Sequence, residues 1–470
     1  LLLHGAGVEI SRNLRDKEPR EFDLVFGVKA DGWFNLMKAA AELPLGATVV
    51  FSSVAGRFGN AGQTDYAAAN DLLCKLTSHL RRSRPGTRAL ALDWTAWAGI
   101  GMATRGSIPK IMEAAGVQTL PPQAGVAWVR RELLSGPFDG EVVVAGALGR
   151  IADELHPQGG VDPAALAGAE PRGPMLDQVS LSLHDGLVAT TTLDPARQPF
   201  LHDHRIDGTP VLPAVMGIEA FAEAARVLAP RHRVVALEQL SFAAPLKFYR
   251  DEPRMLTIGL VLVPDGDELL AHARLFAERR LPGQEVPQRT LHFSGRVRLS
   301  PQAQGPVPLP FGGGPTGVGG TLPAAEVYGL YFHGPAYRVV ASAWSAGELA
   351  VAAFEHPLPP NHAPASAPLC TPPRLVELCF QAAGLWEAAL DGRLALPSRI
   401  ERLRLWVDAA GLEAPGLLAQ ARCSGPGHFD CCVVDGAGRV LLTIDGYRSI
   451  PLPAPIPPQA AESLQRVFRR

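Results

Sequence analysis

The amino-acid sequence predicts two folds in series: an open α/β sheet over residues 1–150, and an α+β unit over residues 175–453 in which one arrangement occurs twice. The first prediction rests on short apolar runs that alternate with helical patterns. The second rests on period-two strands that surround a single long helix, once in each half of the later sequence.

Composition limits the classes of protein that this chain can belong to. Its 470 residues suffice for two or three domains, and 47% hydrophobic with 19% charged residues is typical of a soluble globular protein. No apolar run approaches the roughly 18 residues of a membrane span. The net charge of −2, without a basic stripe, argues against a nucleic-acid partner. Six cysteines without CxxC spacing predict reduced thiols in a cytoplasmic protein and no metal site.

The first 150 residues alternate strand and helix, as an open parallel sheet requires. The expected strands are Leu1–Leu3, Thr48–Phe51 and Ala89–Trp94, and the expected helices are Pro19–Leu43 and Tyr66–Leu80. A glycine turn, Gly5-Ala6-Gly7, follows the first strand.

Four polar residues in this segment are candidates for chemistry: Lys29, Ser53, Tyr66 and Asn70. Tyr66 and Asn70 are four residues apart on one expected helix, so they share a face. Ser53 follows a strand at its carboxyl end, where α/β sheets hold their sites. A tyrosine donates a proton near neutral pH when a nearby cation lowers its pKa, and Lys29 is the candidate cation.

This segment resembles the ketoreductase domains of polyketide synthases, which are Rossmann-like proteins of the short-chain dehydrogenase family. The matching stretches are Val28–Gly32, Phe51–Gly56, Gly62–Asn70, Trp94–Trp97 and Gly101–Ala103. The resemblance implies that Tyr66 protonates a substrate carbonyl, that Ser53 orients it, and that Lys29 and Asn70 sustain a proton relay. It also implies NADPH as the cofactor, with Gly5 and Gly7 in the turn that contacts it.

One part of the ketoreductase pattern is missing from the sequence. The family begins with a strand and a TGGxGxxG loop that seats the cofactor pyrophosphate at a helix N-terminus. Here the glycine turn at Gly5 and Gly7 corresponds to the one after the family's fourth strand. We therefore expect residues 1–150 to be the C-terminal, catalytic half of a ketoreductase, which would not hold NADPH alone.

From Gln178 onward the pattern changes to one long helix with antiparallel strands, used twice, which is a double hotdog fold. The halves are expected at about 175–300 and 321–453, joined by a Pro/Gly-rich stretch, with linkers at 151–174 and 454–470. The expected helices are Met216–Leu228 and Arg374–Leu390, and the expected strands are Val179–Leu183, Leu187–Leu193, Met255–Val263, Ala271–Phe276, Thr290–Leu299, Glu348–Glu355, Ile400–Val407, Leu417–Cys423 and Phe429–Ile444.

Each half contributes one candidate catalytic side chain. His204 lies in an HxxxGxxxxP pattern with Gly208 and Pro213, just before the first helix. Glu377 lies on the second helix, four residues from Gln381 and on the same face. Dehydration of a 3-hydroxyacyl thioester needs a base for the C2 proton and an acid for the departing hydroxyl. A neutral imidazole and a carboxylic acid on opposite sides of one tunnel would supply both.

These patterns resemble the dehydratase domains of polyketide and polyunsaturated-fatty-acid synthases, including the family's YxYGPxF element at Tyr331–Tyr337. The resemblance implies that His204 is the base, Glu377 the acid and Gln381 its helper. Gly208 would donate its N–H to the thioester carbonyl, and Pro213 would shape the turn that aims His204. Tyr331, His333 and Gly334 would line the tunnel. No cofactor is implied for this reaction.

Two residues depart from the dehydratase pattern. Glu377 replaces the usual Asp, and His333 replaces a Tyr. Glu377 remains a competent acid if burial among its apolar neighbours raises its pKa toward neutrality.

Reductase before dehydratase is the order of iterative synthases of the enediyne and polyene type. The resemblance implies an acyl carrier protein with phosphopantetheine as partner, alongside the remaining synthase domains and a possible homodimer. Two other interpretations stay open. One is a product-template-like cyclase or enoyl isomerase on the same fold, and the other is a non-catalytic structural or docking region.

Overall fold

The structure is a computed structural model that describes residues 1–101, 104, 108–134, 140–149, 151, 173–182, 186–279, 287–305, 307–311, 320–408 and 412–468. The chain divides into two compact units, formed by about the first 160 residues and by the remainder, and each is described by itself. Two expectations fall outside the described residues: most of the 151–174 linker and the Met102-Ala103 pair.

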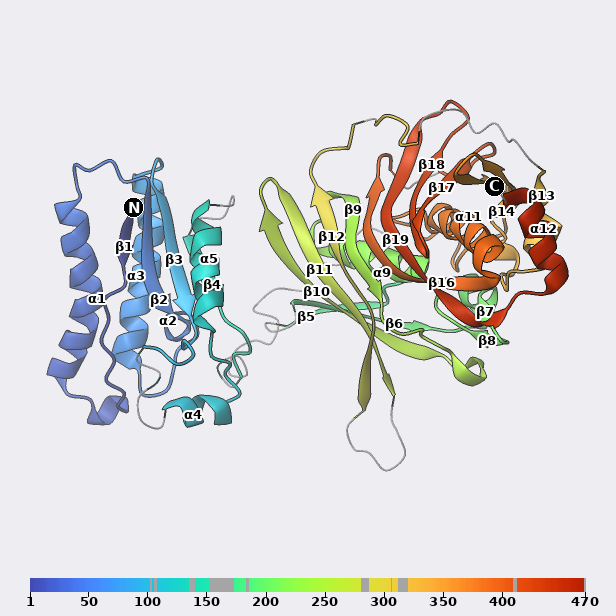
Figure 1. Ribbon diagram of the computed structural model, residues 1–470. Helices are drawn as coiled ribbons and strands as arrows, with labels where there is room; N and C mark the ends of the chain where they lie inside the picture. The colour runs from blue at the N-terminus through green and yellow to red at the C-terminus, as the bar shows by residue number, and fades with distance from the viewer. Residues whose placement is uncertain are drawn as a thin grey trace. The chain divides into compact units, whose positions relative to one another are not determined.

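The first unit is a parallel sheet in the order β1-β2-β3-β4, with helices packed along it (blue to cyan in Figure 1). Its strands are β1 (Leu2–His4), β2 (Ala47–Ser53), β3 (Arg88–Trp94) and β4 (Gly140–Val144). Its helices are α1 (Pro19–Ala39), α2 (Val54–Phe58), α3 (Thr64–Ser83), α4 (Ile108–Ala114) and α5 (Pro122–Leu134). The α/β prediction is confirmed, because the apolar runs of β2 and β3 form the buried middle of the sheet.

The second unit is an antiparallel sheet that curves around two long helices, α9 (Ala214–Leu228) and α11 (Pro373–Asp391) (Figure 1). The strands of its first half are β5 (Gln178–Ser182), β6 (Gly186–Leu193), β9 (Arg233–Phe242), β10 (Arg254–Asp265), β11 (Glu268–Arg279) and β12 (Gln288–Ser300). Those of its second half are β13 (Leu322–Pro323), β14 (Val340–Ala346), β15 (Leu349–Phe354), β16 (Arg393–Leu405), β17 (Leu418–Gly425), β18 (His428–Val434) and β19 (Val440–Pro455). Shorter elements are α8 (Pro199–His202), β7 (Arg205–Ile206), β8 (Thr209–Pro210) and α10 (Ala324–Val327).

The two halves join through one strand pair at the centre of the sheet. From that centre outward, the first half runs β9-β12-β11-β10-β6-β5 and the second runs β16-β19-β18-β17-β15-β14. β9 and β16 pair antiparallel, with Leu237 opposite Leu403. Each half is thus one helix wrapped by strands in the same order, and the two are continuous. The double hotdog prediction is confirmed.

The repeat extends to single residues. His204, Glu219 and Glu223 of the first half are separated by the same number of residues from His362, Glu377 and Gln381 of the second. At the first-half helix positions, Glu219 accepts the N–H groups of Cys370 at 2.6 Å and Thr371 at 2.8 Å, and Glu223 accepts that of Met175 at 3.1 Å. Backbone N–H groups of neighbouring segments therefore cover this pair of carboxyl groups.

Both carboxyl groups of this pair are fully buried, and burial raises their pKa values. That of Glu219 is raised to about 7, and that of Glu223 is raised well above its ordinary range by burial and by the neighbouring Glu219 charge. The folded protein therefore binds a proton that the unfolded chain releases above about pH 4.5. This contribution to stability is complete at low pH and is lost as pH rises through 7.

Replacing Glu223 with Gln should flatten the pH dependence of stability. The amide can still accept the Met175 N–H and donate to Glu219, but it needs no proton from solvent. Between pH 5.5 and 8.5, we expect the unfolding free energy of the parent to fall relative to the variant by about 1 kcal/mol per pH unit. Urea unfolding at both pH values measures this, and parallel curves for the two proteins would contradict it.

The expected C-terminal linker at 454–470 is wrong. β19 continues to Pro455, and α12 (Pro458–Phe468) packs Leu464, Val467 and Phe468 into the core of the second unit. The Phe468 ring lies edge-on to Trp386 of α11, with ring centroids 6.1 Å apart. Pro-rich sequence suggested a linker, but the apolar positions of the short helix that follows it face α11. The unit therefore extends at least to Phe468.

Replacing Phe468 with Ala should destabilise the second unit by about 3–5 kcal/mol, because it removes a buried ring and leaves a cavity beside Trp386. Urea denaturation measures the change. Arg466 is exposed on the same helix, so Arg466→Ala serves as the matched control and should change stability by less than about 0.5 kcal/mol. Equal stabilities of the two variants would show that α12 contributes no core packing.

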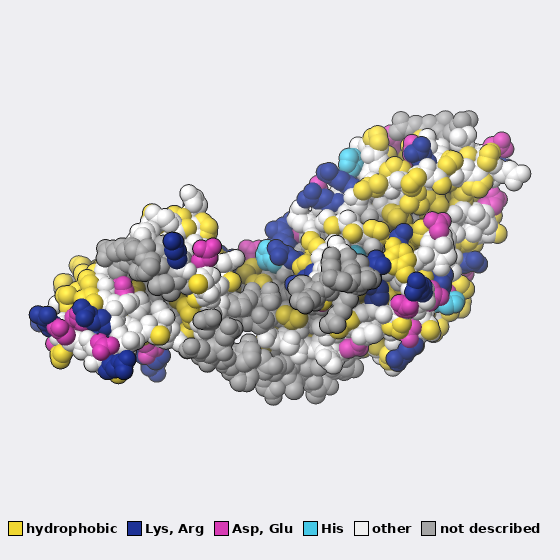
Figure 2. Space-filling model, turned by 90° about the horizontal axis from the view of Figure 1, so that it is seen from below, with side chains coloured by type: hydrophobic (Ala, Val, Ile, Leu, Met, Phe, Trp, Pro, Cys, Tyr) yellow, Lys and Arg dark blue, Asp and Glu magenta, His cyan; other side chains and the backbone are white. Residues whose placement is uncertain are grey.

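Within the described part of the chain, no helix is both long and apolar enough to cross a membrane. On the face that Figure 2 shows, Lys and Arg side chains lie among Asp and Glu side chains and apolar ones.

Candidate active site

His204 lies in the loop between α8 and β7, and its ring is oriented by one backbone contact. Its Nδ1 lies 2.8 Å from the carbonyl oxygen of Val211, which can only accept a hydrogen bond. Nδ1 therefore carries the proton, and Nε2 keeps its lone pair. Burial, as the larger cause, and the nearby His333, as the next, lower the pKa of His204 to about 4. The ring is therefore neutral near pH 7. His202, two residues earlier, is exposed and its ring lies 2.7 Å from Asp203.

A cavity of about 270 Å³ opens beside His204, and both halves of the second unit line it. The first half contributes His204 and apolar residues such as Leu212 and Phe293, and the second contributes Glu377 and Gln381. The imidazole and the carboxyl predicted from the sequence therefore face one mostly apolar cavity.

The carboxyl of Glu377, on α11, is held by a chain of hydrogen bonds that runs through Gln381 to two tyrosines. Its Oε1 accepts the side-chain N–H of Gln381 at 2.9 Å. Gln381 in turn accepts the hydroxyl of Tyr328 at 2.9 Å and donates to the carbonyl of Tyr337 at 3.1 Å. Gln381 thus has a fixed amide orientation, and it supports the carboxyl as expected.

His333 makes a contact that the sequence did not predict. Its Nε2 lies 3.1 Å from Oε1 of Glu377, and its ring lies 5.3 Å from that of His204 between centroids. Burial alone would raise the pKa of Glu377, but the hydrogen bond and charge of His333 outweigh it, so the pKa is lowered. The expectation that burial would raise this pKa is therefore wrong. A sequence pattern shows apolar neighbours on the helix but not a hydrogen-bond partner from another segment.

The residues expected to bind the substrate, as tunnel wall (Tyr331, His333 and Gly334), as thioester donor (Gly208) or as turn former (Pro213), divide into two groups. Tyr331 and His333 line the cavity, whereas Gly208, Pro213 and Gly334 do not. Gly208, at φ +76°, forms the exposed turn of the β7–β8 hairpin, so its placement does not support donation to a thioester. Pro213 precedes α9 and accepts the Met216 N–H at 3.0 Å.

Close packing explains two glycines of the second unit. Gly334 lies against Asp203, where a Cβ would come within 2.8 Å of the side chain. Gly384 of α11 lies beside Tyr331, whose hydroxyl would be 2.5 Å from an added Cβ. This space lets Tyr331 donate to the Gln381 carbonyl at 2.9 Å. A glycine inside an expected helix, as at Gly384, is a sequence feature that could have pointed to this close contact.

The four reductase residues also come together, in the first unit. Ser53 and Asn70 are within hydrogen-bonding reach of the Tyr66 hydroxyl. The Lys29 Nζ lies 5.7 Å from the Tyr66 ring centroid and donates to the Phe51 carbonyl at 2.8 Å. Burial lowers the pKa of Lys29 to about 8 and raises that of Tyr66. The expected lowering of the Tyr66 pKa by Lys29 is therefore not found.

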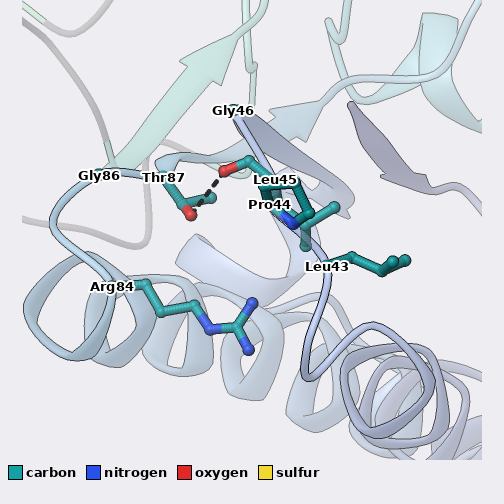
Figure 3. A pocket seen from close by; sticks show the side chains of 7 residues that line it. All are labelled: Leu43, Pro44, Leu45, Gly46, Arg84, Gly86 and Thr87. Atoms are coloured by element: carbon teal, nitrogen blue, oxygen red, sulfur yellow. Dashed lines mark hydrogen bonds between the residues drawn. The ribbon is translucent and has the colours of Figure 1, made fainter.

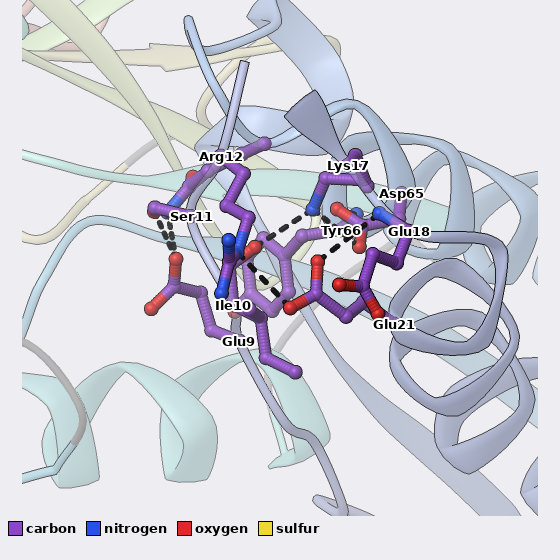
Figure 4. A network of polar contacts seen from close by, with 10 residues as sticks. Glu9, Ile10, Ser11, Arg12, Lys17, Glu18, Glu21, Asp65 and Tyr66 are labelled. Carbon is purple, nitrogen blue, oxygen red and sulfur yellow. Dashed lines mark hydrogen bonds and ion pairs between the residues drawn. The ribbon is translucent and has the colours of Figure 1, made fainter. Parts of the chain in front are cut away.

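A buried ion pair between Lys17 and Asp65, which the sequence did not predict, positions the backbone of Tyr66. Lys17 Nζ lies 2.6 Å from Asp65 and donates to the Ile10 carbonyl at 2.7 Å, while Asp65 accepts the Tyr66 N–H at 2.9 Å (Figure 4). The pair fixes the loop after β1 against the first turn of α3. Asp65 stood in the quoted motif, but its partner lies far away in the sequence.

The described residues could form only part of an NADPH-binding surface. A Cβ on Gly7 would lie 3.2 Å from the Lys29 side chain, so this glycine permits a close approach between the β1 turn and α1. The sequence contains no TGGxGxxG loop to seat the pyrophosphate. The residues present therefore do not fit the whole cofactor, and the contacts of Gly5 and Gly7 with it stay a prediction.

Two further places could be mistaken for sites. Cys74, Asp93 and Glu141 bring potential metal-ligand atoms within 4.8 Å of one another. Burial raises the pKa of the Cys74 thiol and raises that of Asp93 to about 7, so both tend to be protonated. The second place is a depression of about 450 Å³ between exposed loops, with Arg84 and the Thr87–Leu45 hydrogen bond on its wall (Figure 3). It lies where β2 and β3 begin, whereas Ser53 lies at the opposite end of β2.

The fold and this pair of sites define a class: a double hotdog dehydratase that follows a ketoreductase-type α/β segment. Comparison with known families agrees, since residues 2–99 match the KR domain, residues 173–269 a polyketide synthase dehydratase domain, and residues 325–459 the family described as polyketide synthase dehydratase N-terminal domain. The chain is therefore similar to ketoreductase sequence in its first part and to polyketide synthase dehydratase domains in its second.

Individual relatives are similar over different parts of the chain. One subunit of the polyunsaturated fatty acid synthase from a Thraustochytrium species is 29% identical over 86% of this chain and 13% of its own length. The spectinabilin polyketide synthase system protein NorB of Streptomyces orinoci is 45% identical over 21% of this chain and 4% of its own. The chain thus spans a small part of both relatives. The dehydratase domain from the CurF module of curacin polyketide synthase shares the fold, with a TM-score of 0.50 and 17% identity over 60% of this chain and all of that one.

Proposed function

We propose that the second unit removes water from a 3-hydroxyacyl thioester to give the trans-2-enoyl thioester. The observation that carries the proposal is one apolar cavity with a neutral imidazole from the first half and a carboxyl from the second in its wall. An apolar cavity suits an acyl chain, and these two groups suit the transfer of two protons.

The reaction follows from the two side chains. His204 Nε2 takes the proton from C2, since its Nδ1 is committed to the Val211 carbonyl. Glu377 faces the C3 hydroxyl, which leaves as water after it receives a proton. α9 begins at Ala214 in the cavity wall. Pro213 accepts the N–H groups of Met216 and Gly217, which leaves those of Ala214 and Val215 as first-turn donors without an acceptor inside the helix. These donors, in place of Gly208, would polarise the thioester carbonyl.

The substrate would arrive on phosphopantetheine of an acyl carrier protein, within a synthase that supplies the 3-hydroxyacyl group by reducing a 3-ketoacyl thioester. Ser53 and Tyr66, with Lys29 and Asn70 behind them, would serve that reduction in a domain complete enough to hold NADPH. The family order of reductase before dehydratase matches this sequence of reactions.

Turnover by the purified chain tests the dehydration. 3-Hydroxyoctanoyl-pantetheine should yield the trans-2-enoyl thioester and water, and the enoyl thioester should be hydrated in the reverse direction. Mass spectrometry separates a loss of water from the outcomes of the alternatives. Neither alternative acts on the saturated 3-hydroxyacyl substrate: an enoyl isomerase would instead shift the double bond of the trans-2-enoyl thioester at unchanged mass, and a cyclase for ketone-bearing chains or a structural region would give no product from either thioester.

A further inference from the structure

The cavity holds a third titratable side chain with access to the reacting groups. His333 lies in its wall between His204 and Glu377, and its side chain is 4% exposed. Its Nε2 is 3.1 Å from Glu377 Oε1, while its Nδ1 is buried and has no hydrogen-bond partner among the described residues. An orphaned ring nitrogen in a buried site costs about 1–3 kcal/mol, so packing alone does not explain a histidine here.

The two oxygens of the Glu377 carboxyl have different surroundings. Oε1 receives both His333 and the amide of Gln381, whose distances are 3.1 Å and 2.9 Å. Oε2 has no hydrogen-bond partner within the described part of the chain. One oxygen is therefore occupied by protein donors, and the other is left for a substrate hydroxyl.

Dehydration requires a proton that neither His204 nor Glu377 holds at rest. His204 must be neutral to accept the C2 proton, and the low pKa of Glu377 leaves its carboxyl ionised. The proton that leaves with the hydroxyl must therefore be stored beside Glu377. The nearest group that can store it is the His333 ring.

Other titratable groups near His333 do not compete for this role. They are His204 before α9, Tyr331 and Tyr337 of its own segment, Arg338, which donates to its carbonyl, and Glu377 of α11. Burial raises the pKa values of Tyr331 and Tyr337 well above their ordinary range. His204, His333 and Glu377 are therefore the described groups left to pass protons to one another in the cavity.

We propose that His333 is a positioning residue that shares one proton with Glu377 and so keeps the carboxyl loaded as the acid of the reaction. This inference rests on the proposed dehydratase function. In each turnover the C2 proton goes to His204, the C3–O bond breaks, and the shared proton goes to the departing hydroxyl. Glu377 is then ionised and His333 neutral. The proton on His204 passes back to His333, whose ring centroid is 5.3 Å from that of His204, directly or through water.

Replacing His333 with Gln separates proton storage from hydrogen bonding. The Gln amide can still donate to Glu377 Oε1, but it cannot carry a proton. We expect kcat for dehydration of 3-hydroxyoctanoyl-pantetheine to fall by about 10²-fold with KM changed by less than about threefold. Activity requires a proton on the His333–Glu377 pair, so kcat falls as pH rises. This alkaline limb of the pH–rate profile should move to lower pH in the variant. A purely structural role would lower kcat without moving the limb.

Two results would overturn the proposal. One is a His333→Gln variant that matches the parent in kcat and in its pH profile. The other comes from NMR of the protein with ¹⁵N-labelled histidine, which needs neither turnover nor the variant. The ¹⁵N signals of the His333 ring should follow pH differently in the parent and in Glu377→Gln, because the Gln amide cannot share a proton with the ring. Identical titration in the two proteins would refute the shared proton, whereas absence of turnover in the parent would refute the dehydratase assignment instead.

Discussion

Replacing His204 with Ala should lower kcat for dehydration by about 10³-fold or more, because the variant lacks the group that takes the C2 proton. The ring has one free nitrogen, Nε2, since Nδ1 is committed to the Val211 carbonyl at 2.8 Å. The other bases among the described lining residues are Glu377, whose carboxyl is assigned to the C3 hydroxyl, and His333, which contacts Glu377. The measurement is initial-rate kinetics on 3-hydroxyoctanoyl-pantetheine, followed at the absorbance of the enoyl thioester.

His202 provides a matched control for this variant. It is a histidine two positions earlier, its side chain is 69% exposed, and it is absent from the cavity wall. His202→Ala should keep kcat within about twofold of the parent, since an exposed side chain away from the reacting atoms contributes little. If both variants turn over like the parent, His204 is not the base and the dehydratase mechanism is wrong. The His204 base form persists down to about pH 4, so loss of activity between pH 5 and 6 would also contradict it.

The second large effect is expected for Glu377→Gln, with kcat lowered by about 10²–10³-fold and a smaller change in KM. The amide is nearly isosteric with the carboxyl and still fits beside Gln381, but it cannot deliver a proton to the C3 hydroxyl. Exchange of the C2 hydrogen with deuterium should survive in this variant, because His204 remains in place. Proton NMR in deuterium oxide measures that exchange alongside product formation.

Glu387 offers the same substitution on the same helix, away from the chemistry. It is a buried glutamate near the end of α11, bonds to Ser449 at 2.5 Å, and does not line the cavity. Glu387→Gln should therefore leave kcat within about threefold of the parent. Equal losses in the two variants would indicate damage to α11 rather than loss of an acid.

The elements that the sequence predicted best are those with a clear local pattern. The apolar runs of β2 and β3 and the helical periods of α3, α9 and α11 appear within a few residues of their expected bounds. The prediction omitted α5 and β4, which follow the motif-bearing part of the first unit.

β9 was also missed, although it is the strand that joins the two hotdog halves. Its sequence, RVVALEQLSF, lacks period-two alternation, because Glu238 is buried among arginines and Gln239 adopts a positive φ. Arg298 lies 2.8 Å from Glu238 on one side, and Arg402 of β16 lies 3.4 Å from it on the other. A buried carboxylate is tolerated there because neighbouring strands supply its cations. Those partners are remote in sequence, so the local pattern gives no period-two signal.

The sequence by itself determined the two fold classes, their order, and the residue types that carry chemistry: an imidazole before α9 and a carboxyl on α11, four residues from Gln381. Periodicity and motif spacing encode these features, because both are properties of consecutive residues. Only the tertiary structure decided how the groups behave. It placed Gly334 outside the cavity wall and Gly208 in an exposed turn, placed His333 against Glu377, and reversed the expected direction of the Glu377 pKa. A pKa depends on the charges and hydrogen bonds that surround a side chain in space, and here these come from segments that meet only when the two halves pack together.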